Sequence, residues 1–191
     1  MMVRIAICGG IGSGKSAVTS ILRDLGAKVV VADEINAALL CDSDYVREIS
    51  NTFPTVVHNN VINKKELAEI IYRDEGQRRV LMAIAHPRIY ERMFACYPDE
   101  EIVFYEIPLL SETPYSFDRV WFVNADLESR VRRIVARDAV EEGRARRIIA
   151  LQEGESSLAA DADVVIENMG DMSSLRERVK CEYYSILRQF S

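Results

Sequence analysis

A glycine-rich octapeptide near the N-terminus has the residue types of a phosphate-binding loop. Residues 9–16 read Gly-Gly-Ile-Gly-Ser-Gly-Lys-Ser, which matches the pattern G-x-x-x-x-G-K-[ST]. In such a loop the glycines let backbone N–H groups converge on phosphate oxygens, and the lysine faces the β- and γ-phosphates. The hydroxyl of Ser16 is a candidate Mg²⁺ ligand. The pattern predicts a nucleoside triphosphate site with these candidate contacts: Gly10, Ile11, Gly12, Ser13, Gly14, Lys15, Ser16 and Ala17.

Asp33 is the candidate catalytic carboxylate. It follows Val31-Ala32 at the end of a short apolar run, and ligands bind at that edge of open α/β sheets. A carboxylate there can accept the proton of an acceptor hydroxyl and orient that hydroxyl for phosphoryl transfer. The position also suits the N-cap of a helix over Glu34–Leu40. The sequence leaves both roles open.

An arginine-rich segment, residues 130–147, offers a second source of positive charge. It holds seven arginines and three acidic residues. Arg133 and Arg137 are four residues apart, so they share a face of a helix. Their guanidinium forks suit triphosphate oxygens and can stabilise charge on a transferring phosphoryl group. The alternative is a solvated helix whose arginines pair with nearby acids.

Strands and helices alternate in the segments that must position these residues. Short apolar runs predict strands over residues 3–8, 28–31, 102–107, 119–123 and 163–166. Helical spacing predicts helices over residues 15–25, 126–138 and 140–152, the second of them with Asp126 as its cap. A last helix, with Ser173 or Ser174 as its cap, should end near Phe190. The alternation predicts an α/β fold: a mainly parallel five-stranded sheet with helices on both faces.

The long segment between the second and third strands reads as almost wholly helical. It includes Lys64–Tyr72, with Asn63 as a plausible N-cap, and Gln77–Cys96, which Pro87 should interrupt. Because the residue before a proline avoids the helical conformation, the ring of His86 can turn toward a cleft. A structural role is the alternative for a lone histidine. The segment is a candidate helical subdomain.

Composition excludes several classes of protein. A net charge of −6 argues against a chain that works mainly by neutralising nucleic acid phosphates. The four cysteines form no C-x-x-C pair, which favours reduced thiols over a zinc site or a disulfide framework. The N-terminal apolar run is too short for a signal sequence, and no segment approaches the roughly 18 apolar residues of a membrane span. A soluble, cytoplasmic protein without nucleic acid or membrane partners is expected.

The glycine loop alone does not distinguish a kinase from a GTPase or a regulatory ATPase. A GTPase should carry an N-K-x-D guanine reader, but Asn63-Lys64 is followed by Lys65-Glu66. The short chain and the absence of a long acidic and apolar stretch before a sensor arginine disfavour the regulatory ATPase. The arginine-rich segment favours a small kinase that uses ATP.

Several short motifs resemble those of dephospho-coenzyme A kinases, in order and at about the same spacing, over nearly the whole chain. After the glycine loop they are Ala32-Asp33, His86-Pro87-x-Ile89, Pro108-Leu109-Leu110-x-Glu112, Arg133-x-x-x-Arg137-Asp138, Gln152, Ala162-Asp163 and Ile166-x-Asn168-x-Gly170. The resemblance implies a P-loop, three-layer α/β/α fold with a helical substrate-binding insertion and a helical lid. It also implies Mg²⁺-dependent transfer of the ATP γ-phosphate to the 3′-hydroxyl of dephospho-coenzyme A.

The resemblance further implies roles for single residues. The catalytic set is Asp33, Lys15, Arg133 and Arg137. Asn168 and Gly170 border the adenine, and Arg137 also binds ATP. The acceptor is bound by Asp33, His86, Pro87, Leu109, Leu110 and Glu112. The implied organisation is a core (about 1–37, 101–125 and 161–191), an acceptor-binding subdomain (about 38–100) and a lid (about 126–160), in a monomer or small homo-oligomer.

The chain departs from the family pattern at four places. Many relatives have an arginine in place of Ile148 and a basic residue near Leu158, an acid often stands in place of Val31, and a bulkier residue in place of Ser111. Two alternatives stay open. One is a related P-loop nucleoside, nucleotide or small-metabolite kinase with another acceptor, and the other is a nucleotide-binding protein with little transfer activity.

Overall fold

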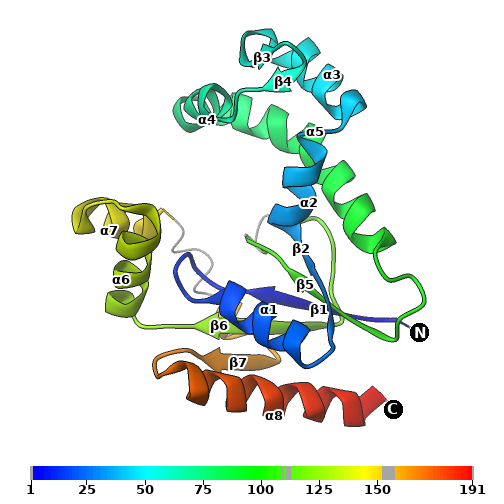
Figure 1. The fold of residues 1–191 in the computed structure, drawn as a ribbon, viewed down its shortest axis with the longest axis vertical. Coiled ribbons are helices and arrows are strands. Elements are labelled where there is room, and N and C mark those ends of the chain that lie inside the picture. Colours follow the sequence, from blue (N-terminus) through cyan, green and yellow to red (C-terminus); the bar gives the residue numbers. More distant parts are fainter. Residues whose placement is uncertain (1, 109, 111–112, 152–157, 191) are drawn as a thin grey trace. The chain divides into compact units, whose positions relative to one another are not determined.

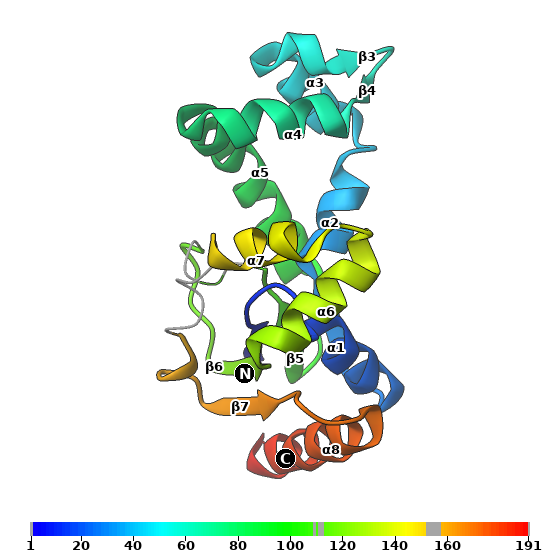
Figure 2. The ribbon, with the colours of Figure 1, turned by 90° about the vertical axis from the view of Figure 1, so that its left-hand side faces the viewer.

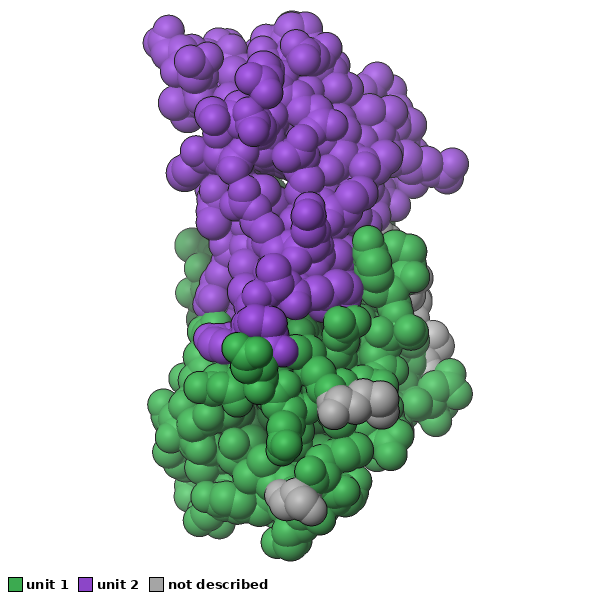
Figure 3. All heavy atoms as spheres, turned by 90° about the vertical axis from the view of Figure 1, so that its right-hand side faces the viewer, with its two compact units in different colours: residues 1–30, 99–191 green, residues 31–98 purple. Residues whose placement is uncertain are grey.

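The computed structural model describes residues 2–108, 110, 113–151 and 158–190. The chain divides into two compact units, which Figure 3 colours separately: unit 1 is residues 1–30 and 99–191, and unit 2 is residues 31–98. Unit 1 carries the glycine loop and most of the parallel sheet. Unit 2 is mostly helical. None of the described helices is long and apolar enough to cross a membrane.

A five-stranded sheet in the order β2-β5-β1-β6-β7 forms the centre of unit 1 (Figure 1). Its strands are β1 (Val3–Cys8), β2 (Lys28–Val31), β5 (Ile102–Glu106), β6 (Arg119–Asn124) and β7 (Val164–Glu167). Strand β1 pairs in parallel with β5 and β6, and β6 pairs in parallel with β7. The predicted α/β fold with a mainly parallel five-stranded sheet is confirmed. The strand ends differ from the prediction by one residue at most.

The helices of unit 1 are α1 (Lys15–Asp24), α6 (Leu127–Asp138), α7 (Glu142–Ala150) and α8 (Met172–Phe190). Helices α1 and α8 contact each other, and α8 lies along the sheet in Figure 1. Phe104 of β5 meets Trp121 of β6 edge-on at 5.1 Å between ring centroids, and it meets Tyr183 of α8 at 6.0 Å. The ring of Trp121 is fully buried, and its indole N–H has no hydrogen-bond partner among the described residues.

Acidic residues set the starts of two of these helices. The carboxylate of Asp126 accepts a hydrogen bond from the Ser129 amide at 2.8 Å, so the cap expected for α6 is confirmed. Helix α8 begins at Met172, and the Asp171 carboxylate accepts from the Ser174 amide at 2.8 Å. The predicted cap at Ser173 or Ser174 is therefore wrong. Asp171 lies earlier in the chain, and its negative charge suits the positive end of the helix dipole.

Unit 2 contains helices α2 (Ala32–Leu39), α3 (Ser43–Thr52), α4 (Lys64–Arg73) and α5 (Glu75–Ala95), a 3₁₀ turn η1 (Pro54–Val56) and a short hairpin of β3 (Val57–His58) and β4 (Val61–Ile62). The side chain of Asn63 accepts from two amides at the start of α4, as predicted. The hairpin was not predicted, so the expectation of an almost wholly helical segment is wrong there. Asn59 and Asn60, between its strands, have φ of +51° and +61°. Asparagine tolerates this left-handed conformation, which a two-residue hairpin turn needs at both positions.

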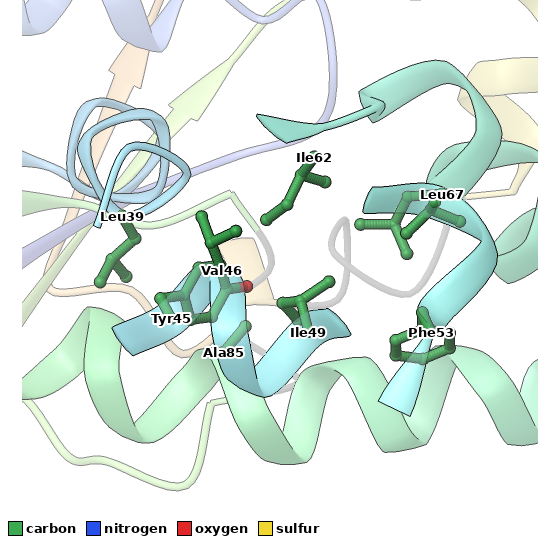
Figure 4. Packing of buried hydrophobic residues seen from close by; sticks show 9 residues of the cluster. Leu39, Tyr45, Val46, Ile49, Phe53, Ile62, Leu67 and Ala85 are labelled. Atoms are coloured by element: carbon green, nitrogen blue, oxygen red, sulfur yellow. The ribbon is translucent and has the colours of Figure 1, made fainter. Parts of the chain in front are cut away.

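A separate hydrophobic core holds unit 2 together (Figure 4). The side chains of α3 lie against α5, and residues of α2, the hairpin and α4 complete the cluster. Its buried members are Leu39, Tyr45, Val46, Ile49, Phe53, Val56, Ile62, Leu67 and Ala85. Burying such side chains contributes roughly 1.5–3 kcal/mol each, which gives the unit its own source of stability.

Helix α5 runs through Pro87 without a break. The predicted interruption is wrong, and so is the expectation that His86 leaves the helical conformation. A proline inside a helix costs about 3 kcal/mol. That cost is offset because the helix buries side chains on both sides of Pro87, with Ala85 before it and Tyr90 and Met93 after it. The His86 ring meets the Tyr90 ring edge-on at 6.0 Å between centroids.

Candidate active site

The glycine loop leaves β1 and leads directly into α1. Gly14 is the N-cap residue of α1, has a φ of +101° and offers no side chain to the first amides of the helix. Those amides and the positive helix end are therefore available to a phosphate. A Cβ at Gly14 would lie 2.1 Å from Nδ2 of Asn168. Glycine is thus required at this position by both backbone conformation and space.

The side chain of Lys15 lies back over the glycine loop. Its Nζ donates a hydrogen bond to the carbonyl of Gly9 at 2.6 Å. This contact keeps the ammonium charge beside the loop, where it can reach the phosphates of a nucleotide. Ser16 follows in the first turn of α1 and is exposed. Ala17 lies in the same turn, and its amide donates to the carbonyl of Gly14 at 3.0 Å.

Arg133 of α6 connects the glycine loop to the segment after β7. Its Nη1 donates to the carbonyls of Gly12 at 3.2 Å and Ser13 at 2.9 Å, and its Nη2 donates to the carbonyl of Asn168 at 2.9 Å. The buried Asn168 in turn donates from Nδ2 to the Ser13 carbonyl at 2.7 Å. Two predicted site residues from distant parts of the chain therefore meet at one point of the loop. Their contacts there are to the backbone of the loop.

Arg137 lies one turn further along α6 and has different partners. It donates from Nε and Nη2 to the two carboxylate oxygens of Asp138, at 2.7 and 2.8 Å. This pairing holds the pKa of the Asp138 carboxyl below its usual range. The alternative read from the sequence, arginines paired with nearby acids, therefore describes this contact of Arg137. It also describes Arg146, which pairs with Glu128 and Glu142.

A buried carboxylate that the sequence reasoning missed stands beside the loop. Glu106, the last residue of β5, is opposite Ile7 of β1 in the parallel register and is only 7% exposed. Its Oε2 lies 3.0 Å from the hydroxyl of Thr19 on α1, whose single proton it shares with the Ser16 carbonyl at 3.1 Å. The available signal was an acidic residue that ends an otherwise apolar strand.

The oxygen atoms of the protein near the loop are of the kind and number that bind Mg²⁺ together with a nucleotide. Among the described residues, no group of three or more His, Cys, Asp or Glu side chains could hold a metal. Mg²⁺ at phosphate sites is held by only one or two protein oxygens, together with phosphate oxygens and water. The exposed Ser16 hydroxyl, with the buried Glu106 carboxylate beside the same turn of α1, meets that requirement.

Asp33 lies in unit 2, in the first turn of α2. The helix begins at Ala32, its N-cap position is Val31, and no side chain caps it. The predicted helix start at Glu34, with Asp33 as its N-cap, is therefore wrong. The helix starts earlier because Ala32 favours it and leaves Asp33 exposed inside the first turn. There a carboxylate interacts favourably with the helix dipole without capping.

The predicted acceptor-binding residues are distributed over both units. His86 and Pro87 lie on α5 of unit 2, which packs against α2, the helix that carries Asp33. Leu110 lies after β5 in unit 1. Gly170, which was predicted to border the adenine instead, lies between β7 and α8. Leu109, Glu112 and Gln152 lie outside the described residues. The structure thus brings the loop, Arg133 and Asn168 together in unit 1.

Comparison with known proteins identifies one family. Residues 3–174 match the family model described as dephospho-CoA kinase. A dephospho-CoA kinase from Moorella thermoacetica is 33% identical, and the alignment covers all of this chain and 95% of the relative. The crystal structure of TT1252 from Thermus thermophilus has a TM-score of 0.85 at 28% identity and covers all of this chain and 98% of its own. A dephospho-CoA kinase from Campylobacter jejuni has a TM-score of 0.66 at 23% identity over 96% of each chain, a likeness in fold.

Proposed function

This chain belongs to the dephospho-CoA kinase family, and from that premise we propose that it transfers the γ-phosphate of ATP to the 3′-hydroxyl of dephospho-coenzyme A. One observation of the structure carries the donor half of this proposal. Gly14 leaves the first amides of α1 uncapped, and the ammonium of Lys15 lies against the same loop. Such a loop binds the phosphates of a nucleotide, and family membership supplies the acceptor.

On the donor side, the loop amides and Lys15 bind the β- and γ-phosphates. Ser16 would hold Mg²⁺ together with phosphate oxygens, with Glu106 next to it. When bound, the ion neutralises charge that develops between the β- and γ-phosphates. Asn168 and Gly170 border the adenine, while Arg133 and Arg137 provide positive charge near the triphosphate. The contacts of Arg133 and Asn168 with the loop backbone support their place in this set.

On the acceptor side, Asp33 accepts the proton of the 3′-hydroxyl. The hydroxyl oxygen then bonds to the γ-phosphorus as the bond to the β–γ bridging oxygen breaks, and ADP leaves. Asp33 suits this role because its carboxylate is exposed and caps no helix. The residues that bind the acceptor are His86, Pro87, Leu109, Leu110 and Glu112.

The proposed organisation remains a core, an acceptor-binding subdomain over about residues 38–100 and a lid over about residues 126–160. Unit 2, with its own buried core, supports the acceptor-binding subdomain. Helices α6 and α7, which Figure 2 shows following β6, pack on each other through Val131, Ile134, Ala145 and Ile149, and this shared cluster supports their assignment to one lid segment. We place the protein in the cytoplasm, as a monomer or small homo-oligomer.

The proposed reaction is tested by incubating the protein with Mg-ATP and dephospho-coenzyme A. We expect a product heavier by one phosphate, with the phosphate on the 3′-hydroxyl. A panel of other hydroxyl acceptors, including nucleosides, serves as the control for acceptor choice. ADP release that never depends on dephospho-coenzyme A at any concentration would rule the proposal out, and faster transfer to a panel member would redirect it to that acceptor.

Arg137→Lys is expected to lower kcat by about 10²-fold while the KM for the acceptor changes little, because an ammonium cannot form a bidentate contact with phosphate oxygens. Arg133→Lys should not preserve function either, since a single ammonium nitrogen cannot take the places of both Nη1, which contacts the loop, and Nη2, which contacts Asn168. Arg132→Lys is the control, because Arg132 is exposed on the same helix and donates to Ser129. Wild-type turnover in Arg137→Lys, with an unchanged KM for ATP, would show that Arg137 is only a surface residue.

A further inference from the structure

Arg130, in the first turn of α6, contacts the glycine loop at a place that none of the proposed catalytic groups uses. Its Nε donates a hydrogen bond to the carbonyl of Ile11 at 2.9 Å. The side chain is half-buried, which lowers the pKa of its guanidinium below the usual value. The half-buried Arg130 side chain is thus partly removed from water and donates to one backbone carbonyl. This arrangement indicates that Arg130 holds the Ile11 carbonyl in place.

The guanidinium of Arg130 lies directly on Gly10. A Cβ at Gly10 would be 2.3 Å from Nη2 of Arg130 and 2.8 Å from Cζ. The three atoms nearest to such a Cβ all belong to this guanidinium. Gly10 has no positive φ, so its backbone conformation would accept other residues. The absence of a side chain at Gly10 therefore makes room for Arg130.

Other atoms in the first two turns of α6 contact the glycine loop at Ile11 and Gly12. A Cβ at Gly12 would lie 2.8 Å from the carbonyl oxygen of Arg130 and 3.2 Å from Cγ1 of Ile134. The side chain of Ile11 packs against the cluster that includes Val131 and Ile134. The loop therefore rests on α6 over Gly10, Ile11 and Gly12, and Arg130 makes the polar contact with Ile11, next to the Arg133 hydrogen bond to Gly12.

The hydrogen bond to Ile11 determines where the next amide points. In a trans peptide the C=O of one residue and the N–H of the next point in opposite directions. Holding the Ile11 carbonyl toward α6 therefore turns the Gly12 N–H to the other side of the loop. Within the described part of the chain, that amide donates to no protein acceptor.

We propose that Arg130 is a positioning residue for nucleotide binding, which acts through the Ile11–Gly12 peptide to aim the Gly12 amide at a phosphate of the bound nucleotide. The inference rests on the proposed function only in taking the glycine loop as the phosphate site. The competing explanation is that Arg130 contributes nothing but its positive charge.

Two variants of equal length separate position from charge. Glutamine carries its Nε2 the same number of bonds from the backbone as the arginine Nε, so Arg130→Gln keeps the donor and removes the charge. Methionine has the same length and no donor, so Arg130→Met removes both. Arg132→Met is the matched control, because Arg132 is exposed on the same helix and contacts Ser129 instead of the loop.

The measurement is the Kd for Mg-ATP by calorimetry, with the KM for ATP, the KM for acceptor and Tm determined on the same preparations. For Arg130→Met we expect Kd and KM for ATP to rise about ten- to hundredfold, the usual range for losing a hydrogen bond from a charged donor. For Arg130→Gln we expect a rise of about threefold or less. The KM for the acceptor should stay unchanged in both variants.

Two results would overturn the inference. Equal losses of ATP affinity in Arg130→Gln and Arg130→Met would assign the effect to charge. Wild-type affinity in Arg130→Met would mean that the contact positions nothing, even if Tm falls. Because ATP binding is measured directly, a protein that binds ATP but never phosphorylates dephospho-coenzyme A would contradict the proposed function and leave this test valid.

Gly10→Ala gives an independent check, since its Cβ would occupy the place of the guanidinium. We expect this substitution to weaken ATP binding in the wild-type background and to have a smaller effect when Arg130 is already glutamine. A double-mutant cycle over the two positions measures the coupling. Equal effects of Gly10→Ala in both backgrounds would show that Gly10 and Arg130 act separately, and would overturn the inference.

Discussion

Lys15→Ala should nearly abolish phosphoryl transfer, with kcat lower by roughly 10³-fold, the upper range for loss of one preorganised group at a developing charge. The structure holds this ammonium against the loop through the Gly9 carbonyl. Alanine leaves the β- and γ-phosphates without that cation. Nucleotide affinity should fall less than turnover, because the loop amides and the other cations still bind the ground state.

The control for this substitution is Lys28→Ala. Lys28 lies in β2 and pairs with Glu100 at 3.3 Å, away from the glycine loop in sequence. Its removal deletes the same charge from unit 1 and should leave kcat within about twofold, since a surface ion pair contributes little. Equal turnover in Lys15→Ala and the wild-type protein would show that the loop is not the working site.

Asp33→Asn is expected to slow transfer by roughly 10² to 10⁴-fold if the carboxylate acts as general base, and by less if positioning dominates a loose transition state. An amide cannot take the hydroxyl proton. ATP binding should persist, and it should tighten slightly if the Asp33 charge lies near the γ-phosphate. Tm should change little, because Asp33 caps no helix and its favourable interaction with the α2 dipole amounts to about 0.3–1 kcal/mol.

Glu34→Gln is the matched control for Asp33→Asn. Glu34 is the next residue, is exposed and occupies the same first turn of α2. A general loss of negative charge at this helix end would slow both variants equally. If Asp33 is catalytic, only Asp33→Asn is slowed. A folded, ATP-binding Asp33→Asn protein with wild-type turnover of dephospho-coenzyme A would show that Asp33 is no more than a favourable charge at a helix end.

The sequence was most informative where a local pattern determines the structure by itself. The strand of residues 3–8 is followed by a loop in which Gly9, Gly12 and Gly14 have a positive φ that glycine adopts freely, so strand, loop and helix follow directly. Asn63 and Asp126 were correctly predicted as caps, because a cap depends only on residues within one turn. The Asn59-Asn60 pair is a comparable local signal for a hairpin turn. It was missed because the whole segment was interpreted as helical.

Predictions failed where packing between distant residues outweighs a local preference. Pro87 disfavours a helix locally, but the core of unit 2 buries the helix on both sides of it. The contacts of the glycine loop are equally distant, since Asn168 reaches Ser13 across 155 positions and Glu106 reaches Thr19 across 87. The residue type of Arg133, and the family resemblance around Asn168, indicated roles near the nucleotide. Their hydrogen bonds to loop carbonyls required the folded structure.

The burial of Trp121 makes the chain's single tryptophan a spectroscopic reporter for one of its two units. The ring lies fully buried in the sheet of unit 1 and contacts the ring of Phe104, and unit 2 contains no tryptophan. Intrinsic emission excited at the indole band therefore follows the unfolding of unit 1 alone, whereas far-ultraviolet ellipticity weighs the helices of both units. A ligand bound at the glycine loop stabilises unit 1 by mass action. Its binding should therefore raise the unfolding midpoint followed by tryptophan fluorescence more than the midpoint followed by ellipticity.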